Sequence, residues 1–132
     1  KELKEKYPEA VFVGFLSGEP LARHMAAADV FVFPSRTDTF GIVLLDALAS
    51  GVPVAAFPVT GPLDVITSDK VGKLDEDLIT AITEALKLDP NDCRNFAMNY
   101  SWANCTEQFF NNLVPAFEDL TVSESHLATE RP

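Results

Sequence analysis

Short apolar runs that alternate with helix-favouring stretches are the feature that most constrains the fold of this chain. The runs VFVGF at 11–15, DVFVFPS at 29–35 and VPVAAFP at 52–58 are rich in the residue types of buried strands. Between the first two, GEPLARHMAAAD has a proline near its start and then many alanines, which favours a helix. This alternation predicts an α/β domain of Rossmann type, with a parallel sheet flanked by helices.

The second half of the pattern repeats the first. The stretch TFGIVLLDALASG predicts a helix that starts near Thr39 and ends at Gly51. KVGKL at 70–74 is consistent with a short strand, and DEDLITAITEALKL predicts a helix. The residues expected on its apolar face are Leu78, Ile79, Ile82, Ala85 and Leu86.

A length of 132 residues predicts one compact domain, to which we assign residues 1–117. One or two further helices are expected after Pro90, and residues 118–132 are expected to be disordered. Cys93 and Cys105 are expected to fill small spaces in the core, since their spacing favours neither a disulfide scaffold nor a metal site. The aromatic residues expected to pack are Phe96, Tyr100, Trp102, Phe109 and Phe110.

The composition argues against two classes of partner. Twenty acidic residues against ten basic ones give a formal charge of −10, which disfavours a broad nucleic-acid interface. No apolar run is long enough to cross a bilayer. We expect a cytoplasmic protein, and for a full-length parent we also consider the cytoplasmic face of a membrane.

The stretch from Pro34 to Ala56 carries the candidate chemistry. Ligands of open α/β sheets bind beyond the carboxyl ends of the strands, which is where the loop 35–41 is expected. The backbone amides at the start of the following helix would be unpaired donors, and such donors suit a diphosphate. The expected donors are Thr39, Phe40, Gly41 and Ile42.

Two acids frame this turn, Asp38 in the loop and Asp46 eight residues later on the helix. Carboxylates only accept hydrogen bonds, which suits the hydroxyls of a sugar or a ribose. The alternative for Asp38 is a helix N-cap, and the alternative for Asp46 is an ordinary solvated position.

Five other residues, at three places in the chain, have plain structural roles as alternatives to a role in the site. Ser35 and Arg36 are equally consistent with a ligand contact and with a surface turn. Gly61 and Pro62 are equally consistent with a turn beside the site and with a plain loop. His24 is interpreted as a surface residue rather than a catalytic one.

Read together, the stretch resembles the retaining glycosyltransferases of the GT-B fold, of the group 1 or family 4 type. These carry an acid, seven residues and a second acid, usually both glutamate, followed by small residues, Gly, Pro and a strand. Here the acids are Asp38 and Asp46, and the downstream part reads ALASGVPVAAFPVTGPLDVI. The segments ADVFVFPS, VGKL and the SW of NYSWANCTEQF are also similar to the family.

The resemblance implies a C-terminal donor-binding domain whose parent enzyme moves a hexose, mannose or glucose first, from a UDP- or GDP-linked sugar to a lipid or glycan acceptor with retention. Asp38 would bind hydroxyls of the transferred sugar, as the catalytic position, and Asp46 would bind the ribose. The amides of residues 39–42 would bind the diphosphate, and Gly14 and Phe15 would lie near the base. No metal and no further cofactor is implied.

The family also has earlier strands, with an Arg and a Lys that neutralise the leaving diphosphate, and an N-terminal domain that binds the acceptor. This chain shows neither, so we expect that it transfers no sugar by itself. We also expect that the segment at 11–15 pairs directly with the strand at 29–35, or that the open sheet edge recruits a second copy of the chain.

Two alternatives to a glycosyltransferase stay open at the level of the sequence. One is another enzyme of similar architecture, such as a sugar phosphorylase or a nucleotide-sugar epimerase. The other is a module without catalytic activity, which binds a nucleotide or assembles with partners.

Overall fold

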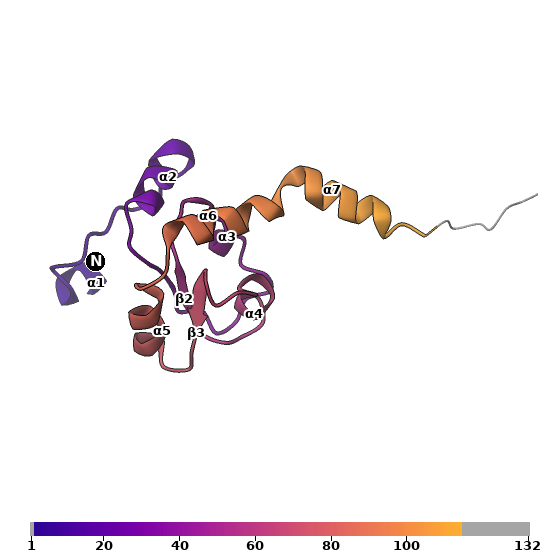
Figure 1. The fold of residues 1–132 in the computed structure, drawn as a ribbon. Helices are drawn as coiled ribbons and strands as arrows, with labels where there is room; N and C mark the ends of the chain where they lie inside the picture. Colours follow the sequence, from indigo (N-terminus) through magenta and orange to yellow (C-terminus); the bar gives the residue numbers. More distant parts are fainter. Residues whose placement is uncertain (1, 115–132) are drawn as a thin grey trace, which may run out of the picture. The chain divides into compact units, whose positions relative to one another are not determined.

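The structure, a computed structural model, describes residues 2–114 (Figure 1). It divides into two compact units, with the boundary between Ser101 and Trp102. The first unit contains the sheet, and the second contains helix α7 (Trp102–Asn111). The segment 118–132, for which we expected disorder, lies outside the described residues.

A three-stranded parallel sheet forms the centre of the first unit. Its strands are β1 (Phe31–Phe33), β2 (Val54–Ala56) and β3 (Gly72–Leu74), in the order β1-β2-β3. β2 pairs with both neighbours, so that its middle residue Ala55 lies opposite Val32 on one side and Lys73 on the other. The prediction of an α/β fold with a parallel sheet is therefore confirmed, as are the strands within 29–35, 52–58 and 70–74.

Helices connect the strands and cover both faces of the sheet (Figure 1). Helix α3 begins at Ile42 rather than near Thr39, because Gly41 has a left-handed φ of 80° and forms the N-cap. It ends just before Gly51, as predicted. The helices of the first unit are α1 (Glu2–Lys6), α2 (Gly18–Ala26), α3 (Ile42–Ala49), α4 (Pro62–Val65), α5 (Leu78–Ala85), α6 (Pro90–Ala97) and the short 3₁₀ helix η1 (Met98–Tyr100).

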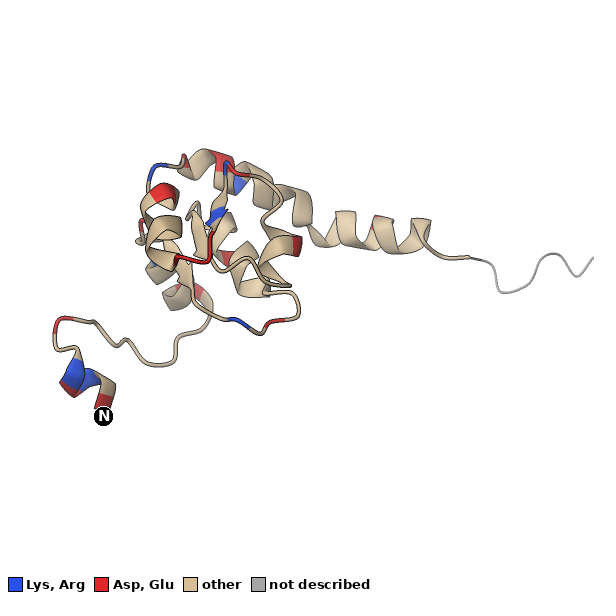
Figure 2. Ribbon diagram, turned by 90° about the horizontal axis from the view of Figure 1, so that it is seen from below, with Lys and Arg blue, Asp and Glu red and all other residues tan. Residues whose placement is uncertain are grey.

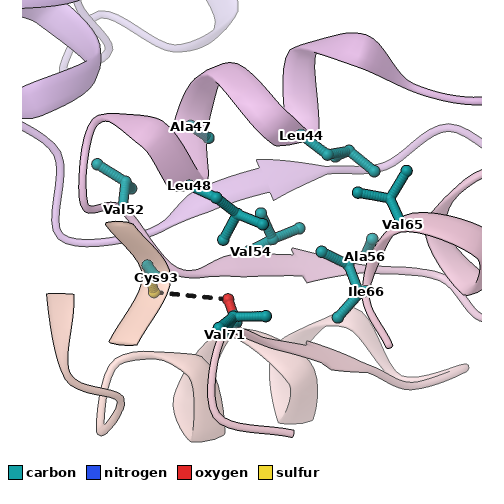
Figure 3. Packing of buried hydrophobic residues seen from close by; sticks show 10 residues of the cluster. All are labelled: Leu44, Ala47, Leu48, Val52, Val54, Ala56, Val65, Ile66, Val71 and Cys93. Atoms are coloured by element: carbon teal, nitrogen blue, oxygen red, sulfur yellow. Dashed lines mark hydrogen bonds between the residues drawn. The ribbon is translucent and has the colours of Figure 1, made fainter. Parts of the chain in front are cut away.

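The core has two layers because successive residues of β2 point to opposite faces of the sheet. Val54 and Ala56 belong to the larger cluster, which α3, α4 and α6 cover, and Ala55 packs on the other face against α5. Figure 3 shows the ten buried residues of the larger cluster converging between helix and sheet. They are Leu44, Ala47, Leu48, Val52, Val54, Ala56, Val65, Ile66, Val71 and Cys93.

Cys93 fills the core as predicted. It is fully buried, and its thiol donates a weak hydrogen bond to the carbonyl oxygen of Val71, with Sγ 3.7 Å from that oxygen (Figure 3). Burial raises the pKa of the thiol to about 11, so that it is protonated at neutral pH. Since the thiolate is the nucleophile, Cys93 is chemically quiet in the folded chain.

The segment VFVGF at 11–15 is not a strand, and this prediction is wrong. β2 already pairs on both sides, and within the described residues the segment makes no ladder with β1 or β3. Without a neighbouring strand its backbone has no sheet partner, and Gly14, with φ of 73°, interrupts the extended conformation. Val11 and Phe15 are consequently about nine-tenths exposed (87% and 92%).

Helix α5 packs through its small residues rather than through all of its large ones. Ala81 and Ala85 are buried, with Leu78 and Ile82 packed beside them, at the spacing of one helical face. Ile79 and Leu86, which we expected on that face, are exposed. Large apolar side chains were expected at this contact. The helix instead lies close to the sheet, and such a close approach requires alanine at the contact.

Packing of the later aromatic residues on the core is confirmed only in the first unit, while in the second unit Phe109 and Phe110 contact each other edge to face, with ring centroids 6.1 Å apart. The rings of Phe96 and Tyr100 lie 5.5 Å apart between centroids, and Phe96 also packs on the core. In the second unit Trp102, Phe109 and Phe110 are exposed, as is Cys105. The described part of that unit is essentially one helix, which cannot bury its own apolar side chains.

No helix within residues 2–114 is both long and apolar enough to span a bilayer.

The cap of α5 gives the stability of the chain a component that depends on pH. Asp77 accepts hydrogen bonds from the Thr80 hydroxyl and the Ile79 amide, and these hold the pKa of its carboxyl below the ordinary value of 3.8. A lowered pKa stabilises the fold above about pH 3.8, and this contribution is lost as the pH falls through the folded-state pKa.

We therefore expect Asp77→Ala to lower the free energy of unfolding at pH 7, and the difference from wild type to shrink below about pH 3.8. Urea titrations at several pH values measure it. Asp29→Ala is the control, since the exposed Asp29 side chain makes no hydrogen bond within residues 2–114. A difference that stays constant down to pH 2 would contradict the assigned role.

Candidate functional site

The loop between β1 and α3 lies at the carboxyl end of the sheet, where the fold predicts a ligand. An open cavity of about 470 Å³ lies on it, lined by Thr37, Asp38 and Thr39. The structure therefore brings one of the two predicted acids, Asp38, to a hollow at the expected place.

Asp38 organises the loop in which it lies. It is half-buried, and its Oδ1 accepts a hydrogen bond from the Phe40 amide at 3.1 Å, which forms a turn closed by the aspartate side chain. Asp38 is not the N-cap of α3, because Gly41 has that position. Its other oxygen, Oδ2, makes no hydrogen bond within the described residues and is free to accept one from a ligand.

The predicted donors divide into two groups because α3 begins at Ile42. Thr39 and Phe40 precede the helix, and the Phe40 amide already donates to Asp38. Within residues 2–114 the amides of Gly41, Ile42 and Val43 have no acceptor, and the first bond of the turn runs from the Leu44 amide to the Gly41 carbonyl at 2.9 Å. These three are the free donors at the positive end of the helix.

Asp46 lies on the exposed side of α3, one turn beyond Ile42. Residues four apart share a helix face, and Ile42 is itself 68% exposed. Asp46 does not line the cavity, and its side chain makes no hydrogen bond within the described part of the chain. It is thus free to accept hydrogen bonds at the helix surface, and its assignment to a ribose remains a prediction.

Gly14 and Phe15 are not joined to the loop by any hydrogen bond or ring contact within residues 2–114. A methyl group added at Gly14 would meet no atom within 4 Å, and Phe15 is almost fully exposed. Their assignment to the nucleobase also remains a prediction.

Gly61 forms a turn directly against the loop. A Cβ added at Gly61 would lie 3.3 Å from the carbonyl oxygen of Phe40 and 3.4 Å from that of Asp38. Its φ of 91° with ψ of −76° is also a conformation that suits only glycine. Of the two interpretations of Gly61, the turn beside the site is the one that the structure supports.

Arg36 does more than the sequence indicated. Its guanidinium lies 3.8 Å from the ring centroid of Phe57, and Nη1 donates to Oε2 of Glu76 at 3.3 Å. The three residues follow β1, β2 and β3 respectively, so they meet at the carboxyl edge of the sheet. Their places just after three parallel strands were the signal available in the sequence.

Comparison with known proteins gives the family. The sequence model described as Glycosyl transferases group 1 matches residues 1–88, about two thirds of the chain. The chain belongs to the group 1 glycosyltransferases. It is 47% identical over 64 residues to the sulfoquinovosyl transferase of Arabidopsis thaliana, and 42% identical over 74 residues to a GDP-mannose-dependent alpha-mannosyltransferase of Corynebacterium glutamicum. It is 33% identical over 113 residues to a D-inositol 3-phosphate glycosyltransferase of Geodermatophilus obscurus.

This glycosyltransferase chain spans only part of the length of these relatives. The alignments cover 48%, 56% and 80% of the chain, but 12%, 18% and 25% of the respective relatives. The matched part of the chain thus corresponds to a minor share of each relative's length.

Among the described residues of this group 1 glycosyltransferase, Glu19, Arg23 and His24 of α2 line a second open hollow. His24 is exposed, with Nδ1 2.8 Å from the Pro20 carbonyl oxygen, and Arg23 pairs with Glu19 in the same helix. Among the described residues there is no group of three His, Cys, Asp or Glu that could hold a metal ion. In Figure 2 the basic residues occur as separate short segments between acidic ones, rather than as one continuous basic run.

Since Gly61 supports the loop of this glycosyltransferase, replacing it should disturb both fold and site. We expect Gly61→Ala to destabilise the chain by about 1–3 kcal/mol, through its φ and through contact with the loop carbonyls. Gly51→Ala is the matched control, because Gly51 also has a positive φ but only ordinary contacts. Urea denaturation measures the free energy of unfolding of both variants. A loss for Gly61→Ala that is no larger than the loss for Gly51→Ala would contradict the assignment.

Proposed function

We propose that this chain is the donor-binding part of a retaining glycosyltransferase with the GT-B fold. The observation that carries the proposal is the loop after β1, where Asp38 and Thr39 line one open cavity and Oδ2 of Asp38 makes no hydrogen bond within the described residues. The first donor to consider is GDP-mannose, since several relatives are described as GDP-mannose-dependent mannosyltransferases. UDP-linked donors, and glucose as the transferred sugar, are the next candidates.

Each group at the site has a proposed task. Asp38 accepts hydrogen bonds from hydroxyls of the transferred sugar, and Asp46 accepts them from the ribose. The amides of Thr39, Gly41 and Ile42, which have no acceptor within the described residues, are proposed to bind the diphosphate, whereas the Phe40 amide already donates to Asp38. Gly14 and Phe15 are proposed to lie near the base once earlier parts of the domain surround them.

In the proposed reaction the bond between the anomeric carbon and the diphosphate oxygen breaks, a new bond forms to an acceptor hydroxyl, and the proton of that hydroxyl passes to the leaving diphosphate oxygen. The leaving nucleoside diphosphate takes the electron pair. The positive end of α3 stabilises that developing charge, but it carries only about half an elementary charge. We therefore propose that the chain by itself transfers no sugar, and that the full-length parent supplies further cations and the acceptor site, a lipid or glycan acceptor included.

The donor assignment predicts a division of labour between the two acids. In the full-length parent we expect Asp46→Ala to weaken GDP and GDP-mannose alike, by about tenfold or more, since hydrogen bonds to a charged group are lost. Asp38→Ala should weaken GDP-mannose and leave GDP nearly unchanged. Isothermal titration measures both, with Asp29→Ala as control.

Several outcomes would contradict the donor proposal. Wild-type protein that binds neither GDP- nor UDP-linked sugars would refute it. Unchanged nucleotide affinity in Asp46→Ala would remove the ribose assignment, and equal losses for GDP and GDP-mannose in Asp38→Ala would remove the sugar assignment.

We also propose that the isolated chain self-associates through the open edge of β1. Phe31 donates its amide to the Pro53 carbonyl oxygen at 2.8 Å, so the amide of the next residue, Val32, points away from β2. An unpaired strand edge of this kind is a template for pairing with another strand. The exposed segment at 11–15 offers strand-forming residues to such an edge on a second copy.

Val32→Pro tests this edge, because proline removes the outward N–H while the bonds to β2 remain. Sedimentation across a concentration series should show dimers or larger species for wild type and for Val32→Ala, and monomers for Val32→Pro. Purely monomeric wild-type protein at all concentrations would refute self-association.

A further inference from the structure

The loop that carries Asp38 has few attachments to the rest of the sheet. Ser35 and Thr37 bond to each other, with the Ser35 hydroxyl 3.3 Å from the Thr37 carbonyl oxygen, and Asp38 bonds to Phe40. These interactions are all internal to the loop. Within residues 2–114, Arg36 is the residue of the loop 34–41 whose side chain bonds to another element.

The attachment through Arg36 joins three loops. The flat guanidinium stacks on Phe57, which follows β2, and the same group pairs with Glu76, which follows β3. Both side chains of the ion pair are largely exposed (59% for Arg36 and 71% for Glu76), so we expect the stacking on Phe57, which a lysine would not reproduce, to contribute most of the restraint. We refer to Arg36, Phe57 and Glu76 as the Arg36 clamp.

The clamp acts two residues before Asp38. Since the loop has no regular secondary structure, the direction of the Asp38 carboxylate depends on where residues 36 and 40 are held. Gly61 lies against the loop at the carbonyl oxygens of Asp38 and Phe40, and the clamp contacts the loop two residues before Asp38. The loop around Asp38 is thus in contact with other parts of the chain on both sides of that residue.

We propose that Arg36 is a positioning residue that sets the orientation of Asp38 toward the sugar of the donor, through its contacts with Phe57 and Glu76. This inference rests on the proposed function, because it requires that Asp38 meets the sugar. The rival role for an arginine here is direct binding of the diphosphate. The two roles give effects of opposite sign when Glu76 is changed.

If the clamp positions Asp38, Arg36→Ala and Glu76→Gln both weaken binding of GDP-mannose, by about tenfold for Arg36→Ala, while the affinity for GDP changes less than about twofold. If Arg36 binds the diphosphate directly, Arg36→Ala weakens GDP as well, and Glu76→Gln frees the cation and tightens GDP. Isothermal titration of the full-length parent with GDP and GDP-mannose distinguishes these results, and the second pattern overturns the proposal. Arg23→Ala, which removes an ion pair inside one helix, is the control.

A double-mutant cycle supplies the sharper test, because a positioning residue has no effect when the residue it positions is absent. In the Asp38→Ala background, Arg36→Ala should change the affinity for GDP-mannose by less than about twofold. If Arg36→Ala lowers the affinity for GDP-mannose as much in that background as it does in wild type, the proposal is overturned. Glu76→Gln, which keeps the size of the side chain, replaces Arg36→Ala in the cycle if the latter does not fold.

Hydrogen exchange without ligand tests the clamp apart from the donor assignment. The Phe40 amide, held by Asp38, should exchange faster in Arg36→Ala and Glu76→Gln than in wild type, and not in Arg23→Ala. If the Phe40 amide exchanges in these variants at the wild-type rate, the clamp is refuted, whatever the affinities for nucleotides are. Faster exchange in protein that binds no sugar nucleotide preserves the clamp, but refutes the proposed function and with it the orientation of Asp38 toward a sugar.

Discussion

The pairing of β2 with a parallel strand on each side is the interaction on which the rest of the structure depends. It buries every residue of β2, and it directs Val54 and Ala56 into one layer of the core and Ala55 into the other. Because all three strands run in the same direction, their carboxyl ends meet at one edge. The loops that leave this edge contain Asp38, Phe57, Gly61 and Glu76. The place of the candidate site is therefore set by the common direction of the strands.

The sequence allowed prediction of those features that depend on local pattern. Val- and Phe-rich runs marked the three strands, and Gly51 marked the end of α3, since both signals arise from neighbouring residues. The segment at 11–15 has the same composition but no strand beside it, and composition alone cannot supply a partner. Ile79 was also expected on the buried face of α5. The buried residues are alanines because α5 packs close to the sheet, and hydrophobic periodicity does not predict the distance between a helix and a sheet.

The site was foreseen in its location and less well in its internal bonds. A carboxylate in the loop and free amides at the helix end followed from chain order, and both are present. The hydrogen bond from Phe40 to Asp38 was not foreseen, because it depends on how the loop turns. The sequence does not decide the role of Arg36 for a related reason. Its partners Phe57 and Glu76 are 21 and 40 residues away, and only the sheet brings them together.

The two cysteines differ in exposure, so that their rates of alkylation can measure how often the core opens. Cys105 is exposed, whereas Cys93 is enclosed by the sheet and α6, and its thiol is protonated at neutral pH. Alkylation of Cys105 is therefore limited by chemistry, and alkylation of Cys93 is limited by how often α6 separates from the strands beneath it. The difference between the two rates reports the frequency of that separation without any added label.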